Sequence, residues 1–386
     1  MSTTFPRGFR AAGVTAGLKP SGKPDLALVV NDGPARTAAA VYTSNRCRAH
    51  PVIWSEQASA DGRVAAVVLN SGGANCFTGP AGMTTVERTA EAVADGLNVA
   101  PGDVVVCSTG LIGVWEQQWE DALLGGIPPL LDSLAAAGGQ AAAEAIMTTD
   151  TVPKTAQLEL DGYRIGGMAK GAGMLAPGLA TMLVVLTTDA DLGADAGATD
   201  AALRHATART FDRLDTDGCM STNDTVVLMA SGASGVTPEL EAFAAAVEQV
   251  CADLAAQLHA DAEGAKHDIV ITTRGAASEE EAVTVSRAIA RSALFKTAIF
   301  GEDPNWGRVL AQIGTTDATF SPDAIDIAIN GVQLCRGGVP DEPPELVRFG
   351  RRVEVLVDLH AGEGEGTVLT SDLTHDYVEE NSVYST

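Results

Sequence analysis

The sequence predicts an α/β protein, and three observations support this class. Short runs of apolar and β-branched residues recur along the chain and have the length of buried strands. Longer alanine-rich stretches lie between them, and their apolar residues return with helical spacing. The composition, 46% hydrophobic and 19% charged residues in a chain of 386, allows a sizeable core. We therefore expect a globular protein of one large or two ordinary domains.

The individual elements follow from these patterns. Four apolar runs are predicted to be buried strands: LALVV from Leu26, VAAVVLN from Val64, DVVVCS from Asp103 and TMLVVLTT from Thr181. Helices are predicted over residues 84–98, 129–147, 197–212, 238–259 and 278–293. The fourth begins with proline and acids and the fifth with SEEEAVTV, which places negative charge where the helix dipole favours it.

The domain organisation is indicated by one change of composition. No fixed-period repeat and no low-complexity linker divides the chain, but TTRGAASEEE at residues 272–281 interrupts the pattern. We expect a main α/β domain over residues 1–276 and a smaller C-terminal α/β domain over residues 277–386. The smaller domain contains strand-like runs near residues 324–329, 352–358 and 366–371.

The charge balance excludes several classes of partner. Lysine and arginine number 25 against 50 acids, so the formal charge of −25 opposes binding to nucleic acid or to anionic lipid. Local cations are still expected to form a positive pocket for a small amino acid. No apolar run approaches the roughly 20 residues that cross a bilayer. The N-terminal segment is a poor signal peptide, and the six scattered cysteines contain no CxxC pair, so we expect a cytoplasmic protein.

Motifs for metals and cofactors fail on inspection. The P-loop spacing from Gly17 is followed by Pro24, where Mg²⁺ binding requires a hydroxyl. The dinucleotide-like GAGMLA from Gly171 runs into Pro177, which interrupts the helix that it needs. The calcium-like DTDG has Cys219 at its fifth position, and no HxH, HExxH or GxSxG occurs. We expect no metal and no cofactor.

The segment with the most unusual chemistry is KGAGMLAPGLATMLVVL, which begins at Lys170. A lysine and a glycine-rich turn lead through Pro177 to Ala180 and then to Thr181, which opens a predicted strand. A β-branched residue is common in strands, so a structural role alone could explain the threonine at this position. The residues around Thr181 nevertheless indicate a functional role.

These surroundings resemble the glutamate N-acetyltransferases, also called ornithine acetyltransferases, which are enzymes of arginine biosynthesis with a cleavage motif much like KGAGMLAPGLATML. Nearly the whole chain shares the resemblance, through NSGGANCFTG (70–79), CSTGLIG (107–113), TTDTVPK (148–154), STNDT (221–225), FGEDPNWGR (300–308) and the C-terminal DLTHDYVEENSVYST. It implies a layered α-β-β-α-like sandwich of the self-cleaving type. It also implies that the tail of the smaller C-terminal domain returns to the active site.

The resemblance implies that the chain cuts itself between Ala180 and Thr181. A threonine hydroxyl is a poor nucleophile unless a base takes its proton, and the cut supplies the α-amine of Thr181, a group with an ordinary pKa of about 8. Thr181 then takes acetyl from N2-acetyl-L-ornithine and passes it to L-glutamate in a ping-pong cycle. Whether acetyl-CoA is a second donor stays open. The family is usually an α₂β₂ assembly of the two fragments.

The site residues of the family map onto this chain by motif. Its oxyanion-hole pair corresponds to Thr109 and Gly110, whose hydroxyl and backbone N–H stabilise a tetrahedral oxyanion. Its substrate-binding residues correspond to Thr148, Lys170, Thr181, Glu263, Asn381 and Thr386. A lysine suits a carboxylate, and a glutamate suits an ammonium. Around the glutamate, this chain reads DAEGAKH where the family usually has DGEGATK.

Two other functions compete with the transferase. The β-aminopeptidases are hydrolases of similar self-cleaving architecture, but they use a serine after the cut, whereas Thr181 and the TTDT, STNDT and PNWGR segments favour the transferase. A non-catalytic ligand-binding or scaffold protein would leave Thr181, Thr109 and Gly110 without a reason to occur together. Incubation with N-acetylornithine and either glutamate or water discriminates all three.

Overall fold

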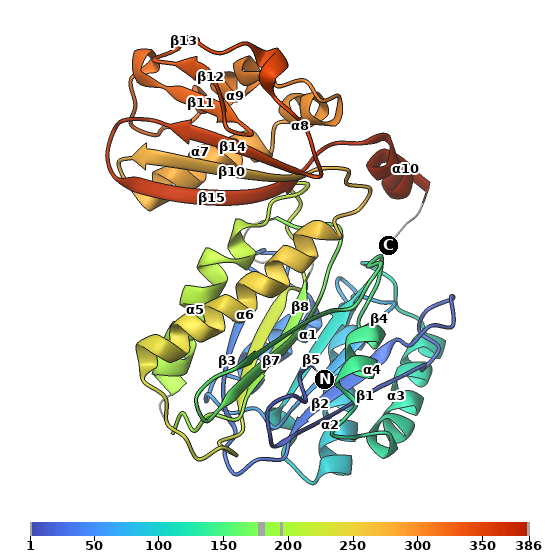
Figure 1. Cartoon of the computed structure of the whole chain (residues 1–386). Coiled ribbons are helices and arrows are strands. Elements are labelled where there is room, and N and C mark those ends of the chain that lie inside the picture. Colours follow the sequence, from blue (N-terminus) through green and yellow to red (C-terminus); the bar gives the residue numbers. More distant parts are fainter. Residues whose placement is uncertain (1, 177–181, 194–195, 384–386) are drawn as a thin grey trace.

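The structure, a computed structural model, describes residues 2–176, 182–193 and 196–383. Its larger part is two β-sheets stacked face to face, each covered on its outer side by helices (Figure 1). A third sheet with its own helices forms a C-terminal domain at one end of this sandwich. The predicted α/β class and the α-β-β-α layering are therefore confirmed.

The first sheet has the strand order β1-β2-β4-β5. Its strands are β1 (Phe9–Val14), β2 (Leu26–Asn31), β4 (Ala66–Ser71) and β5 (Val104–Thr109). Only β4 and β5 run parallel. Three helices pack on its outer face: α1 (His50–Ala58), α2 (Gly79–Leu97) and α3 (Gln117–Asp132). A short 3₁₀ turn, Pro101–Asp103, leads into β5.

The second sheet has the strand order β3-β9-β8-β7-β6. Its strands are β3 (Thr37–Tyr42), β6 (Lys154–Glu159), β7 (Arg164–Lys170), β8 (Leu183–Thr188) and β9 (Thr225–Ala230). Within it, β8 and β9 are parallel and the other neighbours are antiparallel. Two helices cover its outer face: α5 (Ala196–Arg209) and α6 (Leu240–Ala260). The 3₁₀ turn Phe211–Arg213 follows α5.

The stacking of the sheets explains why the predicted strands are apolar without alternation. In β4, Val67 faces the core between the two sheets, whereas Val68 faces the helices outside. In β8, Val185 faces the core between the sheets and Val184 packs under the outer helices. Both faces of each sheet are buried, so both sets of side chains are apolar.

One predicted helix, residues 129–147, is wrong as a single element. The chain instead forms α3, which ends at Asp132, and the short α4 (Gly139–Ala145). Between them, Ala135 pairs with Ala11 through backbone hydrogen bonds in both directions, each 3.0 Å long. At Gly138, a Cβ would lie 1.8 Å from the Ala11 carbonyl oxygen, so only glycine lets the chain approach the sheet this closely.

The C-terminal domain is a six-stranded sheet with helices on one side. Its strand order is β13-β12-β11-β14-β10-β15. The strands are β10 (Asp268–Ala276), β11 (Asp326–Ile329), β12 (Val332–Arg336), β13 (Val339–Pro340), β14 (Arg352–Asp358) and β15 (Gly364–Ser371). Three helices accompany them: α7 (Glu279–Ala290), α8 (Ala293–Phe300) and α9 (Trp306–Ile313). The 3₁₀ turns are Pro322–Ala324 and Pro344–Leu346.

The sheet pairing bears on where the two domains divide. Strand β10, which precedes residue 277, pairs with β14 and β15 of the C-terminal sheet, and Ile269 and Ile271 belong to the core of that domain. We therefore propose a boundary just before β10 in place of one at residue 277.

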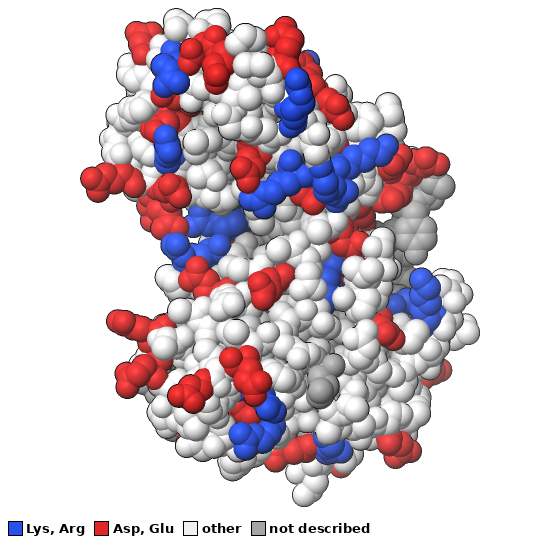
Figure 2. Space-filling model, viewed as in Figure 1, with Lys and Arg blue, Asp and Glu red and all other residues white. Residues whose placement is uncertain are grey.

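The last described element is α10 (His375–Val383), which follows the C-terminal sheet and lies beside the junction of the two domains (Figure 1). Acidic side chains are spread over both domains, and basic ones gather near the place where the domains meet (Figure 2). In the part of the chain that the structure describes, no helix combines the length and the apolar character needed to cross a membrane.

Candidate active site

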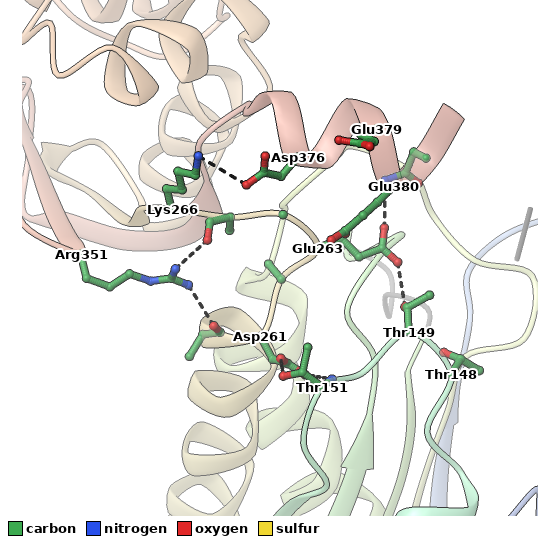
Figure 3. Close-up of a pocket in the computed structure, with 15 residues that line it drawn as sticks. Thr148, Thr149, Thr151, Asp261, Glu263, Lys266, Arg351, Asp376, Glu379 and Glu380 are labelled. Carbon is green, nitrogen blue, oxygen red and sulfur yellow. Dashed lines mark hydrogen bonds and ion pairs between the residues drawn. The ribbon is translucent and has the colours of Figure 1, made fainter. Parts of the chain in front are cut away.

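A cavity of about 910 Å³ lies where the two domains meet. Its walls come from the loop of Thr148, Thr149 and Thr151, from residues 260–266 after α6, from Arg351 and from α10 (Figure 3). Three of the expected substrate-binding residues line it: Thr148, Glu263 and Asn381. These residues are far apart in the sequence, and the fold brings them together.

Glu263 is held by hydrogen bonds to both of its carboxylate oxygens. Oε1 accepts from the Thr149 hydroxyl at 2.7 Å, and Oε2 accepts from Asn381 Nδ2 at 3.0 Å. Room for the carboxylate comes from Gly173, where a Cβ would lie only 2.4 Å from Oε2. The second glycine of the KGAGM segment therefore serves to admit Glu263, and the C-terminal helix reaches the cavity through Asn381.

The charge of the cavity differs from the expected positive pocket, and that expectation is wrong here. The lining contains two basic residues, Lys266 and Arg351. It contains five acids: Asp261, Glu263, Asp376, Glu379 and Glu380. Burial raises the pKa of Glu380, as do the neighbouring charges of Glu263 and Asp376. Acids gathered this closely favour a ligand that carries an ammonium group.

Lys170 is not among the residues that line this cavity. It is the last residue of β7, and its side chain is buried. Its Nζ donates to the hydroxyl oxygen of Thr109 over 3.2 Å. Burial lowers the pKa of Lys170, although the negative charge of Asp150 opposes this effect. The structure thus places this lysine at the expected oxyanion pair.

Thr109 and Gly110 stand at the end of β5. The Thr109 carbonyl accepts from the amides of Gly72 and Gly73, both at 3.0 Å, which ties the strand end to the NSGGAN loop. Gly110 has a φ of 132°, and a Cβ there would lie 2.5 Å from the Gly73 nitrogen. A side chain at this position is therefore excluded by both backbone conformation and space.

Asp150 stands between two buried lysines. Its Oδ1 accepts from Lys154 Nζ at 2.5 Å and from the Gly171 amide at 2.7 Å, and its Oδ2 accepts from the Thr148 amide at 2.9 Å. Burial by itself raises the pKa of Asp150, but the charges of Lys170 and Lys154 and these hydrogen bonds lower it below its usual value. The ionised carboxylate links the cavity wall to the end of β7.

Lys154 extends this network to the other side of the cavity. Its Nζ also donates to Asp261 Oδ2, and the side chain of Lys154 is fully buried. The Thr151 amide donates to the same Asp261 oxygen at 2.9 Å, and the Thr151 hydroxyl donates to Oδ1. Buried ion pairs of this kind hold two chain segments in one geometry because an unpaired charge there is costly.

Ala180, Thr181 and Thr386 lie outside the described residues. Met182 directly follows Thr181 in the sequence, and its amide donates to Asp224 Oδ1 at 3.0 Å. Asp224 is 0% exposed, and burial raises its pKa well above the usual value, against the opposing effect of the Met182 hydrogen bond. Its other oxygen, Oδ2, is buried and has no hydrogen-bond partner among residues 2–176, 182–193 and 196–383.

Sequence reasoning missed Asp150, Lys154, Asp261 and Asp224. Three of them lie within segments that carry the resemblance, Asp150 and Lys154 in TTDTVPK and Asp224 in STNDT. Their presence in those segments was therefore a usable signal. Within the described ranges, no three His, Cys, Asp or Glu side chains are grouped as a metal ion would require.

Comparison with known proteins identifies the family. The family model described as ArgJ family matches residues 10–386. The chain is 60% identical over 386 residues to the "Arginine biosynthesis bifunctional protein ArgJ" of Streptomyces coelicolor, covering 100% of both chains. It is also 60% identical to the protein of that name from Thermobifida fusca over 387 residues, again covering 100% of both.

Two solved structures are similar over about half of this chain. One is ornithine acetyltransferase complexed with ornithine from Mycobacterium tuberculosis, 52% identical, with a TM-score of 0.45, covering 46% of this chain and 94% of that one. The other is ArgJ from Bacillus halodurans, 37% identical, with a TM-score of 0.49, covering 52% of this chain and 98% of that one. By the match of the family model and the identity to curated relatives along its whole length, this chain belongs to the ArgJ family.

Proposed function

We propose that this chain, an acyltransferase of arginine biosynthesis by its family, transfers acetyl from N2-acetyl-L-ornithine to L-glutamate through an acetyl ester on Thr181. The observation that carries the mechanism is the contact of Lys170 with Thr109. Lys170 Nζ donates to the threonine hydroxyl oxygen, so the hydrogen of that hydroxyl is left to donate elsewhere. A hydroxyl held in this way is an oriented donor for an oxyanion.

The nucleophile arises from a cut between Ala180 and Thr181. In this proposal the Thr181 hydroxyl attacks the Ala180 carbonyl carbon, the peptide C–N bond breaks, and water hydrolyses the resulting ester. The cut leaves Thr181 with a free α-amine next to its own hydroxyl. That amine is the base that takes the hydroxyl proton in turnover, because an unassisted threonine hydroxyl is a weak nucleophile.

Each half of the cycle passes through a tetrahedral oxyanion. Thr181 first attacks the acetyl carbonyl of N2-acetylornithine and releases ornithine, and then glutamate attacks the acetyl ester. The Thr109 hydroxyl and the Gly110 N–H are the donors to the oxyanion in both steps. One such donor contributes about 2.7–4 kcal/mol to transition-state stabilisation.

The cavity supplies groups for both substrates. Glu263 suits the side-chain ammonium of N2-acetylornithine, and the nearby acids of α10 strengthen this preference. Lys266 and Arg351, which are about half exposed, suit the carboxylates that ornithine and glutamate carry. Thr148 and Asn381 orient the ligand from opposite walls. Thr386 completes the set that the resemblance implies.

After the cut, residues 1–180 and 181–386 stay together in this proposal. Support comes from the buried pair of Lys154 and Asp261, because these residues lie on opposite sides of the cut. We propose an α₂β₂ assembly that works in the cytoplasm. Native mass measurement tests it, since a free 181–386 fragment in fully active protein contradicts the assembly.

The activity test uses the purified whole protein. With N2-acetylornithine and glutamate, we expect ornithine and N-acetylglutamate in equal amounts. With N2-acetylornithine alone, we expect a burst of about one ornithine per site, because the acetyl ester then has no acceptor. Continuous release of acetate in water would show the hydrolase instead. A parallel reaction with acetyl-CoA and glutamate decides whether CoA is also a donor.

A further inference from the structure

The proposed oxyanion hole depends on the direction in which the Gly110 N–H points. This N–H shares one planar trans peptide unit with the Thr109 carbonyl, so the two groups point in opposite directions. The carbonyl accepts from the amides of Gly72 and Gly73, both at 3.0 Å. The N–H is therefore directed away from the loop that carries these two glycines, and a shift of that loop turns the donor.

One buried side-chain amide joins this loop to the end of β5. It belongs to Asn223, which lies shortly before β9 of the second sheet. Its Nδ2 donates to the Ala74 carbonyl at 2.6 Å and to the Ser108 carbonyl at 2.9 Å. In the sequence, Ala74 directly follows Gly73, and Ser108 directly precedes Thr109. A single side chain thus bridges the two backbone segments that set the direction of the N–H.

The orientation of the Asn223 amide is fixed as well. Its Oδ1 accepts from the Thr222 hydroxyl at 2.6 Å. With the oxygen held there, the nitrogen faces the two carbonyls, and an amide nitrogen has two N–H donors to offer them. Rotation of the amide by half a turn would bring its oxygen against both carbonyl oxygens. The bridge therefore has one stable arrangement.

Asn70, which lies in β4, contacts the same loop. Its Nδ2 donates to the Gly73 carbonyl at 3.0 Å, and its Oδ1 accepts from the Ser108 hydroxyl at 2.6 Å. Ser108 is therefore held by Asn223 at its backbone carbonyl and by Asn70 at its side chain. Both asparagines are buried. Together they connect the loop with the residue that precedes Thr109.

A purely structural role for Asn223 is the alternative. Strand β5 stands at the edge of its sheet, so carbonyls on its outer side need donors from outside the sheet. Two side chains of α1 donate to the carbonyls of Val104 and Val106 in this way, at 3.0 and 2.8 Å. The contact of Asn223 with β5 continues this row. Asn223 differs because it also reaches the loop at Ala74, which covering the strand edge does not require.

We propose that Asn223 is a positioning residue for the oxyanion donors, with Asn70 in the same role, an inference that rests on the proposed function of Thr109 and Gly110. Asn223 acts through the backbone and not by touching the substrate. It keeps the loop and the end of β5 at one separation, so that the donors are aimed before the oxyanion forms. Donors that are already in place need no rearrangement during the reaction, so the effect of Asn223 belongs to kcat.

The decisive variant is Asn223→Leu, because leucine has a similar branched shape and no donor. Steady-state kinetics are measured on the purified whole protein and expressed per cut chain, with the cut fraction read from a denaturing gel. We expect kcat for acetyl transfer to fall by about 10- to 100-fold, because a misplacement of about 1 Å costs up to about 100-fold. We expect little change in KM for N2-acetylornithine. A kcat within twofold of the wild-type value overturns the proposal.

Asn31→Leu is the matched control. Asn31 is also buried, and its Nδ2 donates to the carbonyls of Ala35 and Ala230, both at 3.1 Å. Ala230 is the last residue of β9, whereas Asn223 lies before the first, so the two asparagines lie at opposite ends of the sandwich. We expect both variants to lower the urea midpoint, but only Asn223→Leu to lower kcat. Equal falls in kcat would reduce Asn223 to a structural role.

A double variant separates positioning from a general loss of stability. If Asn223 acts by aiming the oxyanion donors, its effect must shrink when the Thr109 hydroxyl is already absent. We expect Asn223→Leu to lower kcat by a smaller factor in the Thr109→Val background than in the wild-type protein. Independent effects on kcat would multiply instead, and such a result contradicts the positioning role.

Asn70→Leu covers the case in which Asn223→Leu does not fold. It removes the donor to the Gly73 carbonyl, and we expect the same fall in kcat with little change in KM. An unchanged kcat in this variant would also overturn the proposal.

Failure of this inference is distinguishable from failure of the proposed function. If Thr109→Val keeps the wild-type kcat, the oxyanion role itself is wrong. If Thr109→Val loses kcat while Asn223→Leu keeps it, the oxyanion role stands and only the positioning role is wrong.

Discussion

Lys170 and Thr109 are joined by a 3.2 Å hydrogen bond although they end strands of different sheets. Lys170 closes β7 in the second sheet, and Thr109 closes β5 in the first. Both side chains are buried, at 1% and 3% exposure. The ends of β5 and β7, one from each sheet, therefore meet at a single place, where the buried Lys170 side chain orients the Thr109 hydroxyl.

The first prediction concerns that hydroxyl. Thr109→Val keeps the shape of the side chain and removes the donor. We expect kcat for acetyl transfer to fall by about 10²–10³-fold, as for other oxyanion donors, with little change in KM. Steady-state kinetics with N2-acetylornithine and glutamate measure both constants. Thr109→Ser keeps a hydroxyl, so it is the control and is expected to retain most activity. A kcat for Thr109→Val within twofold of the wild-type value would argue against the oxyanion role.

The second prediction concerns the nucleophile. Thr181→Ala removes the hydroxyl, so the chain is expected to stay uncut and to run as one 39.5 kDa band on a denaturing gel. The native variant is expected to be folded and inactive, which circular dichroism and the transfer assay check. Thr181→Ser keeps a hydroxyl and is expected to be cut slowly. Transfer of acetyl by Thr181→Ala at the wild-type rate would remove Thr181 from the mechanism.

The third prediction concerns the room that Gly173 leaves for Glu263. A Cβ at position 173 lies 2.4 Å from Glu263 Oε2, so Gly173→Ala must displace the carboxylate from its partners Thr149 and Asn381. We expect KM for N2-acetylornithine to rise by about 10- to 100-fold, since a lost hydrogen bond to a charged group is worth about 1.5–3 kcal/mol. Kinetics on fully cut protein measure this change.

Gly125→Ala is the control for that substitution. Gly125 lies in α3, and a Cβ there meets no atom within 4 Å. Alanine in a helix is more stable than glycine by about 0.5–1 kcal/mol. We therefore expect unchanged kinetics and a slightly higher Tm. A KM for Gly173→Ala equal to that of Gly125→Ala would show that Glu263 does not contact the substrate.

The fourth prediction concerns Asp150. Asp150→Asn removes the carboxylate whose charge acts on both buried lysines, Lys154 and Lys170, although Lys154 keeps its pair with Asp261. We therefore expect a loss of about 3–5 kcal/mol in the free energy of unfolding at neutral pH. Urea titration measures it. The double variant Asp150→Asn, Lys170→Met also removes an ammonium group whose charge Asp150 offsets, and it is expected to regain part of the loss. An unchanged stability in Asp150→Asn would mean that the lysines are neutral in the folded protein.

The pH dependence of this effect has a definite sign. The folded-state pKa of Asp150 is lowered from 3.8, so its contribution to stability is present above the unfolded value and is lost as pH falls through the folded value. The difference in the free energy of unfolding between the wild-type protein and Asp150→Asn must therefore shrink as the pH falls. We expect the two urea midpoints to converge below a pH of about 3.8 and to stay apart at pH 7. If the urea midpoints of the two proteins differed by the same amount at every pH, ionisation of Asp150 would not be the cause of the stability difference.

The layers of the fold were predictable from local pattern, because burial on both faces makes β4 and β8 uniformly apolar. The break between α3 and α4 was not, because it depends on the pairing of Ala135 with Ala11, which is distant in sequence. The same holds in the site. Asp150 and Asp224 are the same residue type in the sequence, but two buried lysines lower the pKa of Asp150, whereas burial raises the pKa of Asp224.

The strand order of the second sheet determines whether folding or the proposed cut comes first. In β3-β9-β8-β7-β6, strands β8 and β9 come from residues after the proposed cut and are flanked on both sides by strands from before it. The segment after the cut thus lies in the middle of a sheet whose outer strands come from the segment before it, and it pairs with those strands on both sides. The sheet must therefore fold before the bond between Ala180 and Thr181 is cut. A mature enzyme that has been denatured must reassemble from two separate chains, whereas an uncut one refolds as a single chain.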